Sequence, residues 1–126
     1  MGKDPRTARG HAIEAKVAEA LRARGLRIRA MNYACRQGEL DIVAQDGDCI
    51  VVVEVRSQRP GSPVTPRETV TRAKMRRIVA ATNFYLMHEG LEDVEVRYDI
   101  AEVYHEAGLP TARVTWIKGA FNLDDL

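Results

Sequence analysis

The sequence predicts one α/β domain of 126 residues, in which helices cover both faces of a mixed β-sheet. Three observations predict this class. Two long segments carry apolar residues at helical spacing. Several shorter segments are rich in alternating or continuous β-branched residues, which is typical of strands. The hydrophobic fraction of 45 % and the charged fraction of 29 % are those of a globular protein and exclude global disorder.

The first half of the chain predicts one helix and two or three strands. A helix is expected over residues 7–24, followed at residues 26–34 by an edge strand or an extended connection. Residues 39–44 alternate and predict a strand, and the Asp-Gly dipeptide at 46–47 predicts a hairpin turn after it. Residues 49–56 are almost continuously apolar, so we expect a central strand buried on both faces.

The second half repeats the alternation of helix and strand. Three prolines in residues 57–66 exclude a helix or a central strand, so we expect a loop, either a clamp or only a linker. A second helix is predicted over residues 67–88, a strand over residues 94–104 and a last strand over residues 112–117. Residues 121–126 are expected to fray.

Several cellular locations are excluded by what the sequence lacks. It has no run of about 18 apolar residues, so we expect no transmembrane helix and no membrane partner. No apolar core follows the N-terminus, so we expect no secretory signal. Cys35 and Cys49 form no Cys-x-x-Cys motif and no disulfide framework. Together these features predict a cytoplasmic protein.

Charge is divided into blocks, although the net charge is only +1. Residues 1–36 hold nine Lys or Arg and three Asp or Glu, and residues 37–54 hold none and five. Residues 55–87 hold seven and one, and residues 88–126 hold three and nine. A basic–acidic–basic order is expected where a polyanion lies beside a carboxylate cluster that binds a cation. Ordinary solvated faces would give the same blocks.

The acidic block contains the most informative stretch, the predicted hairpin. With a two-residue turn at 46–47, Glu39 faces Glu54, and Asp41 lies diagonally across from Glu54 with a Cα distance of about 7–8 Å. Residues two apart on a strand share a face, so the charged residues of this strand pair project to the same side. They are Glu39, Asp41, Glu54 and Arg56.

Carboxylates on one face of a strand pair repel one another. Two like charges 4 Å apart repel by about 1 kcal/mol in water and by several times more near the protein interior. Hard oxygen ligands of this kind suit Mg²⁺ or Mn²⁺, and such an ion activates water for phosphodiester hydrolysis. Alternatively, Arg56 only neutralises Glu54 or Asp41.

These residues carry a resemblance to a known family. The segments 38–43, Gly-Glu-Leu-Asp-Ile-Val, and 53–56, Val-Glu-Val-Arg, resemble the PD-(D/E)xK nuclease motif. More closely, nearly the whole chain resembles the YraN family of bacterial proteins, itself similar to archaeal Holliday-junction resolvases. Further matches are Gly10 with Glu14, Asn32, Lys74 with Ala80-Ala81 and Tyr85-Leu86, Arg97-Tyr98-Asp99 and Gly119-Ala120-Phe121.

The resemblance implies a fold and a set of roles. The fold is the restriction-endonuclease-like three-layer sandwich, with helices on both sides of a mixed central sheet. Asp41 would be the central metal ligand and Glu54 the second ligand. Glu14 would complete or orient the metal site, and Glu39 would be an auxiliary carboxylate.

The chain departs from the nuclease motif at one catalytic position. The motif has Lys two residues after the Glu, where this sequence has Arg56. Lys loses its proton readily when buried, whereas Arg effectively cannot. Arg56 can therefore position water or stabilise negative charge, but it is a poor general base. Lys74, on the second predicted helix, is the candidate replacement.

A dense basic stretch follows the acidic hairpin. It predicts contacts with the phosphate backbone of DNA, whose affinity would fall steeply with salt. A solvated helix face is the alternative. The arginines concerned are Arg59, Arg67, Arg72, Arg76 and Arg77.

These features and the resemblance together predict a Mg²⁺-dependent endonuclease that hydrolyses DNA, with branched DNA among its substrates. Two alternatives stay open. One is a catalytically inactive nucleic-acid-binding module of the same fold, which Arg56 favours. The other is a protein-interaction domain that docks through its acidic C-terminal third. The resolvase-like relatives also suggest a homodimer.

Overall fold

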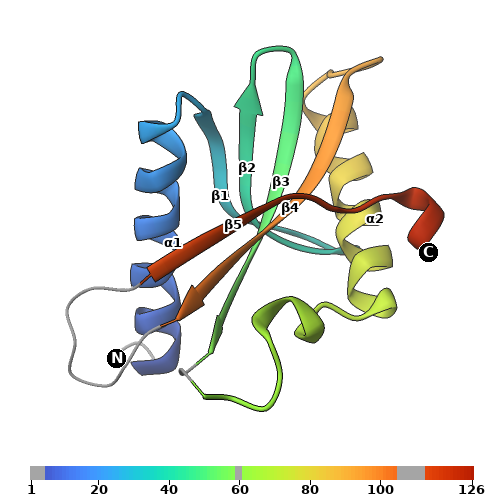
Figure 1. The fold of residues 1–126 in the computed structure, drawn as a ribbon. Coiled ribbons are helices and arrows are strands. Elements are labelled where there is room, and N and C mark those ends of the chain that lie inside the picture. Colours follow the sequence, from blue (N-terminus) through green and yellow to red (C-terminus); the bar gives the residue numbers. More distant parts are fainter. Residues whose placement is uncertain (1–4, 59–60, 105–112) are drawn as a thin grey trace.

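The computed structural model describes residues 5–58, 61–104 and 113–126, with side chains described from Gly10 onwards. In these residues one helix precedes three successive strands, and a second helix precedes two further strands (Figure 1). The helical elements are α1 (Pro5–Ala23), the 3₁₀ turn η1 (Pro66–Thr69), α2 (Arg72–His88) and the 3₁₀ turn η2 (Leu123–Asp125). The strands are β1 (Arg27–Cys35), β2 (Gly38–Asp46), β3 (Cys49–Gln58), β4 (Glu95–Tyr104) and β5 (Arg113–Phe121).

The strands form one mixed sheet in the order β1-β2-β3-β4-β5. The β3–β4 pair is parallel and the other pairs are antiparallel. Helix α1 covers one face of the sheet and α2 the other (Figure 1). The predicted α/β sandwich with a mixed central sheet is therefore confirmed.

Strand β3 is the centre of two separate apolar cores. Val51 and Val53 pack on the α1 side, whereas Ile50 and Val52 pack on the α2 side. All four side chains are at most 1 % exposed. The prediction of a central strand buried on both faces is confirmed, and this run contributes buried apolar surface to both cores.

The second helix begins later than the sequence predicts. Thr65 caps the short η1 turn, where its backbone N–H donates to Glu68 at 2.7 Å, and Val70 then adopts an extended conformation. Thr71 caps α2 by accepting a hydrogen bond from the backbone of Lys74. Two capping threonines thus divide the expected helix into two segments. No helix in the described part of the chain is both long and apolar enough to span a bilayer.

The C-terminal segment is held in place rather than frayed, in contrast to the expectation for residues 121–126. Phe121 is 4 % exposed and stacks on Tyr98 with ring centroids 4.9 Å apart. The side chain of Asn122 accepts a hydrogen bond from the backbone of Asp124 and caps η2. Strand β5 therefore runs four residues beyond its predicted end at Ile117, and the predicted first residue, Ala112, lies outside the described residues.

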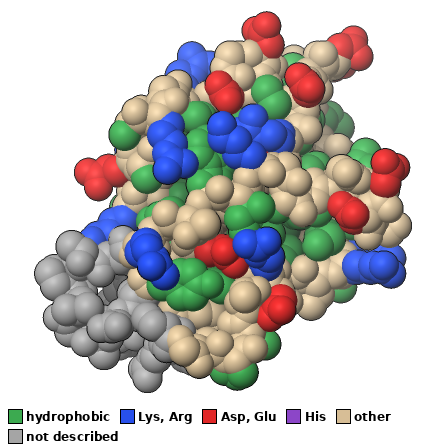
Figure 2. Space-filling view, in the orientation of Figure 1, with side chains coloured by type: hydrophobic (Ala, Val, Ile, Leu, Met, Phe, Trp, Pro, Cys, Tyr) green, Lys and Arg blue, Asp and Glu red, His purple; other side chains and the backbone are tan. Residues whose placement is uncertain are grey.

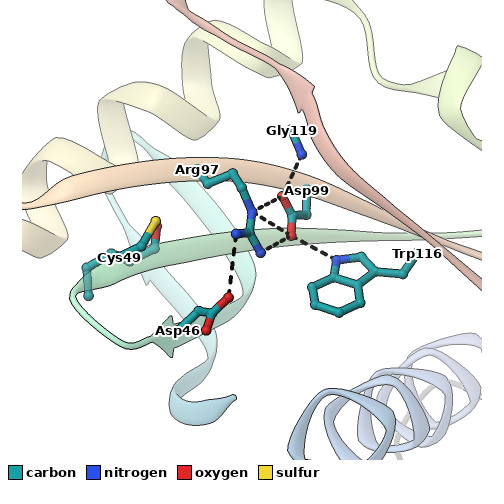
Figure 3. Close-up of polar contacts among 7 residues, drawn as sticks. Asp46, Cys49, Arg97, Asp99, Trp116 and Gly119 are labelled. Carbon is teal, nitrogen blue, oxygen red and sulfur yellow. Dashed lines mark hydrogen bonds and ion pairs between the residues drawn. The ribbon is translucent and has the colours of Figure 1, made fainter. Parts of the chain in front are cut away.

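A buried carboxylate joins β4 to β5 on the α1 side (Figure 3). Asp99 is fully buried and accepts hydrogen bonds from Arg97 Nε at 2.9 Å and Trp116 Nε1 at 2.8 Å. The backbone N–H of Gly119 donates to it at 2.9 Å. Gly119 has a φ of 58°, where other residues are strained, and lies at the register shift between the two strands. Asp99 thus fixes both the bulge and the indole ring.

Replacing this carboxylate tests its structural role. Asp99→Ala leaves the guanidinium, the indole N–H and a backbone N–H without their acceptor, so we expect a loss of about 3–5 kcal/mol in the free energy of unfolding. Urea denaturation measures this loss. Asp48→Ala, in the exposed hairpin turn, is the control and should stay within about 0.5 kcal/mol of the wild type. Equal stability of the two variants would show that the network is dispensable.

Candidate functional site

The β2–β3 hairpin brings the predicted acidic residues together in a register that differs from the expected one. Asp46 pairs with Cys49, so the turn is at residues 47–48 rather than 46–47. The pairing is therefore shifted by two residues, which leaves every side chain on its predicted face. The register ends at the pair Ile42–Val53, and its next step places Asp41 directly opposite Glu54 instead of diagonally across from it.

Asp41 lies where the ladder between β2 and β3 ends. Its Oδ2 accepts a hydrogen bond of 2.9 Å from the backbone N–H of Val55, a donor that the ladder no longer satisfies. Glu54 is 8 % exposed, and its Oε1 accepts a hydrogen bond of 2.8 Å from Arg56 Nη2. Glu54 Oε2 and Arg56 Nε are both buried and find no hydrogen-bond partner among the described residues. The pair therefore carries one unused acceptor beside one unused donor.

A pocket of about 450 Å³ opens beside this pair, between the hairpin and α2. Strand β2 approaches α2 closely there, because a Cβ on Gly38 would lie 3.2 Å from the backbone oxygen of Arg77. All four residues predicted to be catalytic line this pocket, and so does Arg77, which was predicted to bind nucleic acid. Its polar lining is Glu39, Asp41, Glu54, Arg56, Lys74 and Arg77.

Burial and mutual repulsion raise the pKa values of both carboxyl groups of the pair. Burial first, and then the charge of Asp41, raise the pKa of Glu54 to about 8, although the charges of Arg56 and Lys74 oppose this shift. Burial also raises the pKa of Asp41, against the hydrogen bond from Val55 and the charge of Arg56. The two carboxylates therefore act on each other as well as on their surroundings, and both pKa values are shifted upward.

Glu14 on α1 belongs to the same electrostatic environment but does not line the pocket. Burial and then the charge of Asp41 raise its pKa to about 7, and a hydrogen bond with the side chain of Asn32 opposes the shift. Its Oε2 is buried without a hydrogen-bond partner in the described part of the chain. Asn32 has a φ of 52°, so a local distortion of β1 places this amide beside Glu14.

The carboxylates of the pocket suit a cation that a bound substrate also coordinates. They suit a cation held by protein ligands alone less well. In residues 10–58, 61–104 and 113–126, no three His, Cys, Asp or Glu side chains converge closely enough to hold a metal ion. The predicted four-carboxylate set of Asp41, Glu54, Glu14 and Glu39 is therefore not assembled. Mg²⁺, however, is commonly held by one or two carboxylates, waters and substrate phosphates. The Asp41–Glu54 pair and its unused Glu54 oxygen meet that requirement.

The predicted basic residues are only partly gathered at the pocket. Arg77 lines it, whereas Arg72 and Arg76 are exposed elsewhere on α2. Arg67 donates to Glu102 from its backbone N–H at 3.0 Å and also through its guanidinium. Arg59 lies outside the described residues.

Sequence reasoning missed Glu102, which is 3 % exposed and ties η1 to β4. On the sheet it pairs with Arg56 of the neighbouring strand. A charged residue inside an otherwise apolar strand is the signal that could have drawn attention to it.

The fold and the pocket define the class of this protein: a three-layer α/β protein with a paired-carboxylate pocket at the end of its central hairpin. The chain belongs to the family described as Uncharacterised protein family UPF0102, whose model matches residues 13–103. This is the YraN family that the motifs predict, and all the pocket residues lie within the matched range.

Relatives of similar length support this membership. A "UPF0102 protein" of Anaeromyxobacter dehalogenans is 43 % identical over 122 residues, which cover 96 % of this chain and 89 % of the relative. Another, of Chromohalobacter salexigens, is 39 % identical over 114 residues, 90 % of each chain. A third, of Persephonella marina, is 36 % identical over 116 residues, 92 % of this chain and 95 % of the relative.

The raised pKa of Glu54 makes a prediction about stability. Between the usual value of 4.5 and about 8, the folded state binds more protons at this group than the unfolded chain does. The free energy of unfolding therefore falls as pH rises through this window. Glu54→Gln keeps an acceptor for Arg56 and removes the charge, so at pH 8 it should be about 1–3 kcal/mol more stable than the wild type.

Urea denaturation at pH 5 and pH 8 measures this difference. The advantage of Glu54→Gln should shrink at pH 5, where the wild-type carboxyl is already protonated in the folded state. Glu92→Gln, at an exposed position, is the control and should follow the wild type at both pH values. A Glu54→Gln variant that is less stable than the wild type at pH 8 would contradict the electrostatic account.

Proposed function

We propose that this chain is a Mg²⁺- or Mn²⁺-dependent endonuclease that hydrolyses DNA phosphodiester bonds, with branched DNA among its substrates. The observation that carries this proposal is the Asp41–Glu54 pair, which lines an open pocket and includes a buried carboxylate oxygen without a hydrogen-bond partner among the described residues. Three cationic side chains, Arg56, Lys74 and Arg77, line the same pocket and match a phosphate group in charge. The resemblance to PD-(D/E)xK nucleases adds support from the sequence.

Asp41 and Glu54 would hold the metal ion. When bound, the ion supplies Lewis acidity and a water of lowered pKa. The Val55 N–H fixes the orientation of Asp41, and Arg56 fixes that of Glu54. Neither carboxylate has to reorganise when the cation and the phosphate arrive, which is the kind of preorganisation that favours catalysis.

Lys74 supplies the amine of this pocket. Arg56 is already bonded to Glu54, so it orients the carboxylate, and its partly exposed guanidinium places a positive charge beside the phosphate. Lys74 comes from the first turn of α2, is partly buried, and its charge acts on Glu54. It is therefore placed to orient the attacking water or to stabilise developing charge on the phosphate.

Arg56 also favours a second candidate function, nucleic-acid binding without hydrolysis. The same pocket would then hold a phosphate next to Arg56, Lys74 and Arg77 without turnover. This candidate predicts salt-sensitive DNA binding and no cleavage in the presence of Mg²⁺ or Mn²⁺. Cleavage assays with both ions, on linear and branched DNA, separate the two functions.

The metal role of the acidic pair is tested by Asp41→Asn. The substitution keeps the shape and an acceptor for the Val55 N–H but removes a charge that holds the cation. We expect the cleavage rate to fall by about 100-fold or more, since metal-ion catalysis contributes several kcal/mol, while DNA binding without metal persists. Asp48→Asn, in the exposed turn, is the matched control and should cleave like the wild type. Cleavage by Asp41→Asn at the wild-type rate would refute the metal assignment.

The role of Lys74 is tested against another cation of the same helix. Lys74→Gln should lower the single-turnover cleavage rate by about 100-fold, which is the usual contribution of a proton-transfer group. Arg76→Gln removes an equal charge from an exposed position of α2 outside the pocket, so it should mainly weaken DNA binding. If the two variants lose cleavage to the same extent under saturating DNA, Lys74 has no special role.

A further inference from the structure

A second site of contact is built around Trp116, on the other side of the sheet from the pocket. Trp116 pairs with Ala101 of β4, and both residues belong to the core on the α1 side. Asp41 and Glu54 instead face the pocket on the α2 side. The indole is half-buried, and its Nε1–H is fixed by the fully buried Asp99 (Figure 3). The orientation of this ring is therefore determined by the fold.

Two exposed cations lie on this fixed ring. The guanidinium carbon of Arg24, at the end of α1, is 5.0 Å from the ring centroid. The Nζ atom of Lys118, on β5, is 4.6 Å from it. Both distances are those of cation–π contacts. In the described part of the chain no carboxylate forms an ion pair with either side chain.

Arg97, the third cation near the ring, differs from Arg24 and Lys118 because carboxylates compensate its charge. Arg97 lies 5.9 Å from the ring centroid, but Asp99 pairs with it and Asp46 lies 3.6 Å away. Its charge is therefore compensated within the protein. An aromatic partner, by contrast, orients Arg24 and Lys118 without neutralising them, so their charge and their hydrogen-bond donors stay available to an external anion.

The shape of the surface indicates which part of a ligand would be bound. The pocket between α1 and β5, whose walls include Ala20, Leu21, Arg24 and Trp116, has a volume of only about 80 Å³. At about 30 Å³ for each water molecule in the liquid, it holds two or three waters and is too small for a nucleobase. Lys and Arg side chains are exposed, together with Asp and Glu side chains, on the face of the molecule that carries β5 in front (Figure 2). A polyanion would therefore be bound at its charged backbone rather than through its bases.

We propose that Arg24 and Lys118, positioned by Trp116, bind the phosphate backbone of DNA at a site separate from the carboxylate pocket. A substrate would then contact the protein on both sides of the sheet, and the Trp116 site would contribute binding energy without taking part in hydrolysis. This site extends the proposed function but does not need the chain to be a nuclease, because backbone binding requires neither metal nor turnover.

Trp116 is the only tryptophan of the chain, so its fluorescence reports directly on this site. Duplex DNA is titrated into the Asp41→Asn variant in the presence of EDTA, which removes cleavage from the measurement. We expect the emission of Trp116 to change with the same midpoint as binding followed by an independent label on the DNA. Binding that leaves the emission of Trp116 unaltered would place the DNA elsewhere and overturn the proposal.

The two cations are tested by salt dependence in the same background. Each of Arg24→Gln and Lys118→Gln should weaken DNA binding and reduce the slope of log K against log salt concentration by about 1, and the double variant by about 2. Arg22→Gln is the matched control, because it removes the same charge from α1 about 200° around the helix and should change the slope by less. An unchanged slope in the double variant would refute the site.

Two further outcomes separate this site from the proposed function. The Arg24→Gln, Lys118→Gln double variant is also made with Asp41 intact. If it loses affinity for DNA but keeps its cleavage rate at saturating DNA, both the Trp116 site and the nuclease function hold. If no variant cleaves DNA but the salt slopes change as expected, the Trp116 site stands and the nuclease function fails. Polyglutamate that binds as tightly as DNA at equal salt would overturn the assignment to phosphate.

Discussion

Two carboxylates, Asp41 and Glu54, are held beside each other at the point where the two central strands separate, and this constraint shapes the rest of the pocket. The register of the hairpin fixes their positions, because Ile42 and Val53 beside them are fully buried. Sliding the strands by one residue would turn this apolar pair out of the core on the α1 side and bring the carboxylates into that core. The repulsion between the carboxylates therefore cannot be relieved by moving the backbone, and only a proton, a cation or a nearby Arg can offset it.

The surrounding elements supply such compensation from two sides. Arg56, two residues along the same strand, pairs with one oxygen of Glu54 and leaves the other oxygen free. Helix α2 adds Lys74 and Arg77, and its distance from the pair is set by the close approach of Gly38 to the helix backbone. The buried Glu102 holds η1, the segment that precedes α2. The hairpin thus contributes the carboxylates of the pocket, and α2 contributes cations beside them.

The faces of the strands could be predicted from the sequence because they depend only on alternation. The predicted turn was displaced by one residue and the pairing by two, yet Asp41, Glu54 and Arg56 still share a face, since a shift of two preserves it. The start of α2 could not be predicted in the same way. Thr65 and Thr71 are both good N-caps, and only tertiary contacts such as that between Arg67 and Glu102 decide that the chain uses both.

The contacts of Asp99 lie beyond what sequence patterns reveal. Asp99 belongs to the Arg-Tyr-Asp match of the family resemblance, but its partners Trp116 and Gly119 are 17 and 20 residues away along the chain. A bulge that depends on a positive φ at Gly119 brings them together. Neither this bulge nor the orientation of the half-buried indole can be predicted from the alternation of apolar and polar residues. The Trp116 site could therefore be found only in the structure.

The exchange of the expected Lys for Arg56 also has a structural explanation. The planar guanidinium of Arg56 bonds to Glu54 through Nη2 and keeps further N–H groups, in a fixed geometry that an ammonium on a flexible stem lacks. In the proposed function, the transfer of a proton, which Arg cannot perform, would fall to another residue of the pocket. Among the described lining residues, Lys74 is the side chain that combines a titratable amine with proximity to Glu54. In the proposed function, phosphate binding and proton transfer would be divided between a strand and a helix, and hydrolysis would depend on the position of α2 relative to β3.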